Sequence, residues 1–205
     1  MNDHAELIDK FIASFEAVAD ELFADQILDP VAWQLAPGPE NAYGRKEWRP
    51  LAQRTDASEL DPLYAKLPAR FPPLYEQLVL SYRWADVDLQ SFTLLANPPG
   101  NGLSGLLQRI MSDKGLWETL IPNGYIPFAK GTDIDYDPVC FDIKSRKNRD
   151  YRIVKIDHEE ILCNYRIKVV SELALSFRAL VLQTIERAAE SANLDERSSG
   201  FRLRN

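Results

Sequence analysis

The sequence has few of the residues on which common catalytic and redox sites depend. Its 205 residues include two cysteines and two histidines. Cys140 and Cys163 form no Cys-x-x-Cys unit, and both lie in apolar, strand-like surroundings. We therefore expect free, buried thiols in a reducing cytoplasm rather than a disulfide. Because His4 lies close to the amino terminus, His158 is the one histidine within the body of the chain.

Long apolar runs are absent as well. No stretch approaches the roughly 20 consecutive apolar residues that cross a bilayer. The first residues, MNDHAELIDKF, have neither the basic start nor the apolar centre of a secretory signal. We expect a cytoplasmic protein that does not bind a membrane.

An excess of basic residues is also missing. The 24 lysines and arginines stand against 31 acids, for a formal charge of −7. A phosphate-binding surface needs a net positive field, so we expect no direct nucleic-acid partner. Residues 1–30 carry eight acids and one base, and a basic cluster, KSRKNRDYR, covers residues 144–152. These charges are either a solvated surface or the means of attracting a charged protein partner.

The motifs of several enzyme classes are absent. The chain has no Gly-x-x-x-x-Gly-Lys-Ser/Thr loop, no Gly-x-Gly-x-x-Gly after a strand and no His-Glu-x-x-His pair. The stretch DHEE, residues 157–160, is expected to form a turn after a strand, and PPGNGLSG, residues 98–105, a plain loop. Neither cysteine has a basic activator nearby in the sequence. We expect a protein that is not an enzyme, with no catalytic residue, cofactor or metal.

Apolar spacing predicts four helices. Residues recurring at intervals of three and four, as on the buried side of a helix, predict a first helix capped by Asp3, a second starting at Pro72–Pro73, a third from about Leu103 to Leu120 and a long fourth from Ser171 to about Ala192. Between the first two helices we expect irregular chain, with short extended pieces at Ala32–Leu35 and Lys46–Leu51.

Alternating or continuous apolar segments predict the strands. They comprise Val87–Ala96, then YIPF, PVCFDI and YRIVKI, and a further piece within CNYRIKVV. Val139–Ile143 and Tyr151–Ile156 flank a basic connection and predict a hairpin. Since the strands are adjacent in sequence, the expected class is α+β with a mostly antiparallel sheet flanked by helices. We expect an acidic helix and irregular extension over residues 1–62 packed on the core, the main domain over residues 63–192 and a flexible tail over residues 193–205.

Four aspartates lie in the segment KGTDIDYDPVCFDI. Asp133-x-Asp135-x-Asp137 imitates the start of an EF-hand loop, but Pro138 and Lys144 occupy the positions that require Gly and a bidentate Glu, which excludes an EF-hand. The fourth, Asp142, alternates with Phe141 and Ile143. We expect its side chain on the opposite face, where it contacts solvent or a nearby turn.

Five segments occur in an order that resembles the SUKH superfamily. They are LPARFPPLYEQLVLSY, YIPFA, VCFDI, IVKIDHE and LALSFRALV, and the resemblance covers about Leu67 to Leu182. The superfamily includes the fungal cell-wall assembly regulator and bacterial immunity proteins. The chain departs from it where DIDYDP replaces a Gly-Asp pair, and where Val79 and Leu80 replace an aromatic residue and a leucine.

The resemblance implies a SUKH-like fold and a protein-binding role without catalysis, such as neutralising a basic toxin domain, for example a nuclease. The contact residues expected on this basis are Asp133, Asp135, Tyr136, Asp137 and Asp142, with an exposed Trp84 as a further candidate. A solvated turn is the alternative interpretation of the loop. Two other functions stay open: an intracellular scaffold or regulatory adaptor that uses the amino-terminal extension, and a small-ligand-binding protein with a cleft.

Overall fold

The computed structural model describes residues 3–18, 22–100, 102–132 and 136–202, with the side chains of residues 193–202 left out. Ten strands and eight α-helices lie in these ranges, and the α+β class is confirmed. The helices are α1 (Asp3–Val18), α2 (Pro30–Gln34), the 3₁₀ helix η1 (Ala57–Leu60), α3 (Asp61–Tyr64), α4 (Pro73–Ser81), α5 (Ser104–Ile110), α6 (Lys114–Leu120), α7 (His158–Asn164) and α8 (Phe177–Arg202).

The main sheet has six strands in the order β10-β9-β8-β7-β6-β5, all antiparallel. The predicted hairpin is its centre, with Phe141 opposite Ile153 and Asp142 opposite Arg152. The strands are β1 (Phe23–Ala24), β2 (Lys46–Glu47), β3 (Leu51–Ala52), β4 (Tyr82–Arg83), β5 (Val87–Asp88), β6 (Thr93–Leu94), β7 (Tyr125–Lys130), β8 (Pro138–Lys147), β9 (Asp150–Ile156) and β10 (Val169–Ala174).

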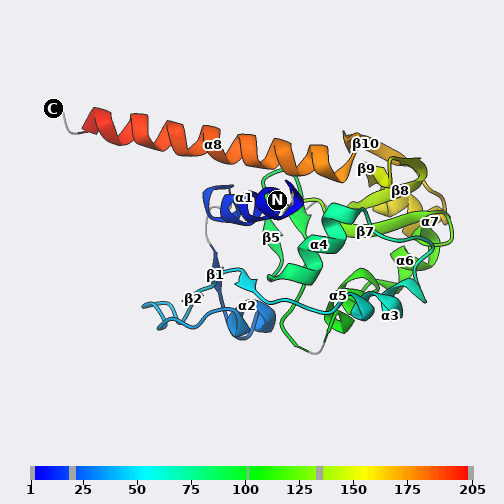
Figure 1. The fold of residues 1–205 in the computed structure, drawn as a ribbon, viewed down its shortest axis with the longest axis horizontal. Coiled ribbons are helices and arrows are strands. Elements are labelled where there is room, and N and C mark those ends of the chain that lie inside the picture. The colour runs from blue at the N-terminus through cyan, green and yellow to red at the C-terminus, as the bar shows by residue number, and fades with distance from the viewer. Residues whose placement is uncertain (1–2, 19–21, 101, 133–135, 203–205) are drawn as a thin grey trace.

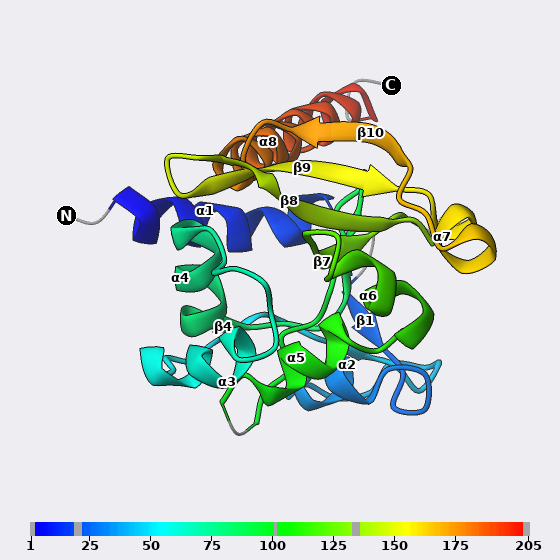
Figure 2. The same ribbon diagram turned by 90° about the vertical axis from the view of Figure 1, so that its right-hand side faces the viewer.

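One face of the main sheet packs on α1, α4 and the first part of α8. Figures 1 and 2 show α1 beside α8, with the far end of α8 extending beyond the body. Phe128 and Phe141 stack with their ring centroids 4.2 Å apart, and both contact Tyr75 of α4 and Phe177 of α8. Phe11 of α1 reaches Phe177. The first helix therefore belongs to the same apolar core as the sheet.

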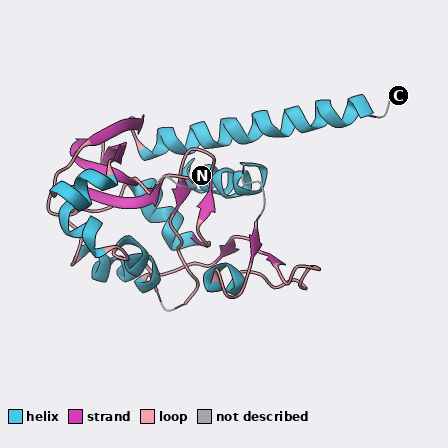
Figure 3. Cartoon of the chain, turned by 180° about the vertical axis from the view of Figure 1, so that it is seen from behind, coloured by secondary structure: helices cyan, strands magenta, loops and turns pink. Residues whose placement is uncertain are grey.

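The opposite face of the sheet is also covered. A smaller apolar cluster joins Cys140 and Val154 of the central hairpin to Leu120 of α6 and Ile161 of α7. Figure 3 shows that helices lie on several sides of the strands. The strands β7, β8 and β9 are apolar on both faces, as expected for a sheet that is buried on both sides.

Several predicted elements are interrupted where a polar side chain caps the backbone. Val87–Ala96 is not one strand but the tight hairpin β5–β6, in which the Asp88 carboxylate accepts from the Gln90 amide and Gln90 has a φ of 68°. The helix predicted from Leu103 to Leu120 is two helices, since Asp113 caps the start of α6. Asp29 likewise caps α2, so Ala32–Leu35 is not extended.

The chain after β9 also differs from prediction in three places. Residues 157–160 do not form a turn: Asp157 caps α7, whose first residue is His158. Ser171 lies in β10, and the long helix begins at Phe177. Both cysteines are free, but Cys163 is exposed, because α7 turns Ile161 inward and Cys163 outward.

The aromatic stack predicts the cost of removing one ring. Phe141→Ala is expected to lower the free energy of unfolding by about 3–5 kcal/mol, because it deletes a fully buried ring from a packed core. Urea unfolding followed by circular dichroism measures the change. Leu162→Ala, on the exposed side of α7, is the control and should change it by about 0.5 kcal/mol or less. Equal losses in the two variants would contradict this assignment.

Candidate partner-binding site

The loop between β7 and β8 is closed at its base by the backbone. Lys130 pairs with Pro138 across the two strands, and the Gly131 amide donates to the Asp137 carbonyl oxygen over 2.9 Å. Two of the predicted contact residues, Asp133 and Asp135, lie outside the described residues. Of the predicted contact residues in this loop, the structure describes Tyr136 and Asp137.

Asp137 ties this loop to the start of α7. Its Oδ1 accepts a hydrogen bond from the His158 backbone amide at 2.8 Å and lies 2.7 Å from His158 Nδ1. The carboxylate side chain is 17% exposed. Among the predicted contact residues, Asp137 is thus bonded within the fold and anchors the loop.

Tyr136 is the predicted residue that projects outward. It is 62% exposed, and its ring meets the ring of His158 edge-on with a centroid distance of 6.1 Å. On its other side it lines a pocket of about 160 Å³ between the sheet and the α5–α6 pair. We call this the Tyr136 pocket; it is lined by Leu95, Arg109, Ile110, Ser112, Asp113, Leu116, Trp117, Leu120, Pro127, Ala129, Lys130, Tyr136 and Pro138.

The Tyr136 pocket has mostly apolar walls and charged groups among its lining residues. Arg109 forms an ion pair with Asp86, and Lys130 Nζ lies 3.9 Å from Asp86 Oδ2. Asp113 is exposed at the start of α6. An apolar cavity of about 150 Å³ holds benzene, so a pocket of this size accepts one aromatic ring or one branched aliphatic side chain.

Asp142 is buried in the central hairpin rather than exposed at the surface. It is 3% exposed, and its Oδ2 pairs with Arg152 of the neighbouring strand at 2.8 Å. Its other oxygen accepts a hydrogen bond from the Lys144 amide, which lies in the same strand, so both expected environments, solvent and a nearby turn, are wrong. Arg152 also reaches Glu172, which links β8, β9 and β10. The hydrogen bond that Arg152 donates to the Asp142 carboxylate raises the pKa of Arg152.

Trp84 is not exposed, contrary to prediction. Its exposure is 0%, and its indole Nε1 donates to the Leu95 carbonyl oxygen at 2.9 Å. The backbone of Trp84 bridges to Asn97 through two hydrogen bonds of 3.0 Å. Trp84 directly follows β4, and no local pattern in the sequence distinguishes this buried position from an exposed one.

The sequence offered little sign of the Tyr136 pocket. Arg109 and Asp86 are 23 residues apart, and neither belongs to a motif. Trp117 lies on α6, is half-buried and lines the pocket. No local pattern around Tyr136 reveals which helices stand opposite it.

The described residues also bear on whether the chain could hold a metal ion or span a membrane. In the described part of the chain, no three His, Cys, Asp or Glu side chains gather closely enough to hold a metal ion. None of the described helices has both the length and the apolar character needed to cross a membrane. No protein-family model matches the chain, and no curated protein matches it.

The burial of Asp142 predicts a structural effect of removing its charge. Asp142→Asn should lower the free energy of unfolding by about 1–3 kcal/mol, because Arg152 loses its least exposed partner. The control is Glu118→Gln, which removes an exposed pair with Lys114 and should change stability by about 0.5 kcal/mol or less. If Asp142→Asn left urea unfolding unchanged, the structural assignment of Asp142 would be wrong.

The cap of α7 predicts a pH dependence. Hydrogen bonds from Lys168 and from the Glu160 amide hold the pKa of Asp157 below its usual value. A lowered folded-state pKa stabilises the protein above the unfolded pKa of about 3.9, and the stabilisation disappears as the pH falls through the folded value. Asp157→Asn keeps a capping side chain but has no charge. Its deficit in unfolding free energy should therefore be present at pH 7 and shrink below about pH 4; a deficit independent of pH would contradict the assignment.

Proposed function

We propose that this chain is a non-enzymatic protein-binding domain of the SUKH superfamily, of the immunity type, which neutralises a basic toxin domain by binding it directly. The observation that carries the proposal is the exposed Tyr136 beside an apolar pocket sized for one side chain. The ordered segments between Leu67 and Leu182 support the superfamily, and the antiparallel α+β fold is compatible with it.

A surface of this kind suits an interface hot spot. Binding energy concentrates in a few buried anchors, among which tyrosine, tryptophan and arginine are enriched. Here Tyr136 would be covered by the partner while one partner side chain enters the Tyr136 pocket between Trp117 and Ala129. Asp137 would hold the loop in place through His158 without contacting the partner.

The charge of the chain supports a basic partner. The net charge of −7 produces a field that attracts a positively charged protein and speeds its association, an effect that salt weakens. On α1, Glu6 pairs with Lys10 and Glu16 with Arg49, so those acids are partly neutralised within the chain. The attraction is therefore a property of the whole surface rather than of one helix.

A second candidate, the adaptor, is favoured by one specific observation. The segment after α1 exposes four large apolar side chains, Phe23, Ile27, Leu28 and Tyr43, the last of them 86% exposed. Figure 1 shows β1 and β2 of this segment away from the main sheet. Deleting residues 1–60 would remove Phe11 and Phe15 from the core, so the adaptor is better tested by substitution than by truncation.

The proposal predicts how much binding affinity for a partner is lost when the Tyr136 side chain is shortened to that of alanine. A protein captured from source-cell lysate by the tagged chain at low salt should be basic and should dissociate as salt rises. Its affinity should fall by about 2 kcal/mol or more, roughly thirtyfold, for Tyr136→Ala. Ser112→Trp, which places a ring at the pocket, should block it as well. Titration of the purified pair by calorimetry provides the measurement.

Tyr43→Ala is the matched control, since it removes another exposed tyrosine, from the segment after α1. It should leave affinity for an immunity-type partner unchanged. A partner that tolerates Tyr136→Ala but is lost with Tyr43→Ala would overturn the proposal in favour of the adaptor.

A further inference from the structure

A buried arginine lies behind α4 without a counter-ion. Arg83 of β4 is 0% exposed, and within the described ranges it forms no ion pair with a carboxylate. Its Nη1 donates to the Val79 carbonyl oxygen at 2.7 Å and to the Tyr82 carbonyl oxygen at 2.9 Å. Burial lowers the pKa of Arg83, yet a guanidinium stays protonated in proteins. A full positive charge is therefore held inside the fold.

The end of α4 compensates only part of this charge. Val79 and Tyr82 lie at the carboxyl end of that helix, which carries the equivalent of about half a negative charge. Asn97 contacts the same two carbonyl oxygens through Nδ2, so it adds no anion. In addition, Arg83 Nε has no hydrogen-bond partner among the described atoms. The charge and hydrogen bonding of Arg83 are thus incompletely satisfied by the part of the chain that the structure describes.

One more hydrogen bond leads from Arg83 to the surface. Its Nη2 donates to the Thr55 hydroxyl oxygen, while the Thr55 amide donates to the Leu80 carbonyl oxygen at 2.8 Å. A hydroxyl that accepts from a cation still has its own hydrogen to donate. Thr55 lines a pocket of about 640 Å³, within the usual size range of small-ligand sites. The buried charge is therefore one hydroxyl group away from this pocket.

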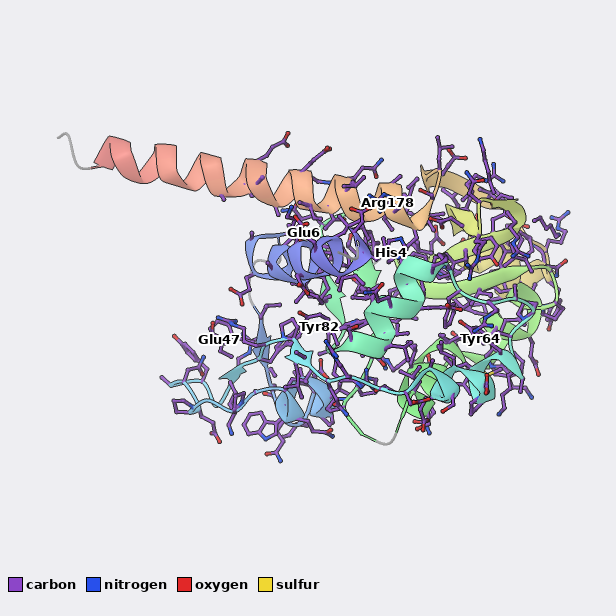
Figure 4. The ribbon with its side chains drawn as sticks, in the orientation of Figure 1. His4, Glu6, Glu47, Tyr64, Tyr82 and Arg178 are labelled. Atoms are coloured by element: carbon purple, nitrogen blue, oxygen red, sulfur yellow. The ribbon has the colours of Figure 1, made fainter. Side chains whose placement is uncertain are left out.

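This second pocket, the Thr55 pocket, lies between α1, α4 and the strands β3 and β4. Figure 4 shows Tyr82 below α1 and beside the lower end of α4. Arg54 also lines the pocket, and in the described structure it has no ion-pair partner. Among the described lining residues, Asp9 supplies the one carboxylate, which accepts a hydrogen bond from the Tyr82 hydroxyl at 2.9 Å. Ile8 and Leu80 add apolar wall.

We propose that the Thr55 pocket binds a small molecule through an anionic oxygen group, a carboxylate or a phosphate. The anion accepts a hydrogen bond from the Thr55 hydroxyl, whose oxygen is polarised by Arg83, and pairs with Arg54. The apolar wall formed by Ile8 and Leu80 contacts the remainder of the ligand. This site is separate from the Tyr136 pocket, and it shares no lining residue with it.

The experiment is a titration of the isotope-labelled chain with sodium acetate and with sodium phosphate at constant ionic strength, followed by backbone amide resonances. Saturable shifts of the Gln53, Arg54 and Thr55 amides are expected with at least one of the two anions. Saturation with acetate identifies the bound group as a carboxylate, and saturation with phosphate identifies it as a phosphate. The control is tetramethylammonium chloride, which adds an organic cation together with the chloride that the buffer already contains. It should produce no saturable shift.

Matched variants separate binding from folding. Thr55→Val keeps the shape and removes the hydroxyl, and it should weaken anion binding tenfold or more, whereas Thr55→Ser should bind like the wild type. Arg54→Gln, an exposed change that cannot disturb the core, should also weaken binding. Arg146→Gln, on the exposed hairpin tip, should have no effect. Shifts that never saturate with either anion, or binding that survives both Thr55→Val and Arg54→Gln, would overturn the proposal.

Discussion

The fold depends on the stacking of Phe128 on Phe141 at the centre of the main sheet. These rings come from neighbouring strands, and Tyr75 and Phe177 close over them from two helices. The cluster is the point at which elements from distant parts of the chain meet. Phe11 extends it to the first helix, so this helix belongs to the same core as the sheet. The two pockets are placed by elements that are fixed on this cluster.

Much of the central sheet was predictable because its signal is local and strong. The strands β7, β8 and β9 are continuous apolar segments, and a polar connection separates the last two. Breaks within apolar stretches were not predictable from periodicity. The Asp88 and Asp113 carboxylates each accept a hydrogen bond from a backbone amide at the point where the chain turns. An aspartate on an amphipathic helix or strand usually has no such effect. A single side-chain hydrogen bond therefore decides between one element and two.

The candidate site shows a second limit of what residue patterns in the sequence can predict. Alternation correctly assigned Asp142 to the face opposite Phe141, but that face is covered by α6 and α7 and is not solvent. Trp84 was wrongly expected at the surface, because its burial depends on pairing with Asn97, which belongs to a later segment of the chain. Tyr136 was correctly expected to be accessible, whereas Asp133 and Asp135 lie outside the described residues. The Tyr136 pocket and the surroundings of the buried Arg83 both depend on residues far apart in sequence, which no local pattern joins.

The central claim is that a protein partner covers Tyr136. Site-specific photo-crosslinking tests it most directly, with a benzophenone amino acid placed at position 136 and, in a parallel chain, at position 43. The account predicts that position 136 crosslinks one basic protein in source cells and that position 43 does not crosslink it. Crosslinks to the same partner from position 43 alone would contradict the account and move the interface to the amino-terminal segment.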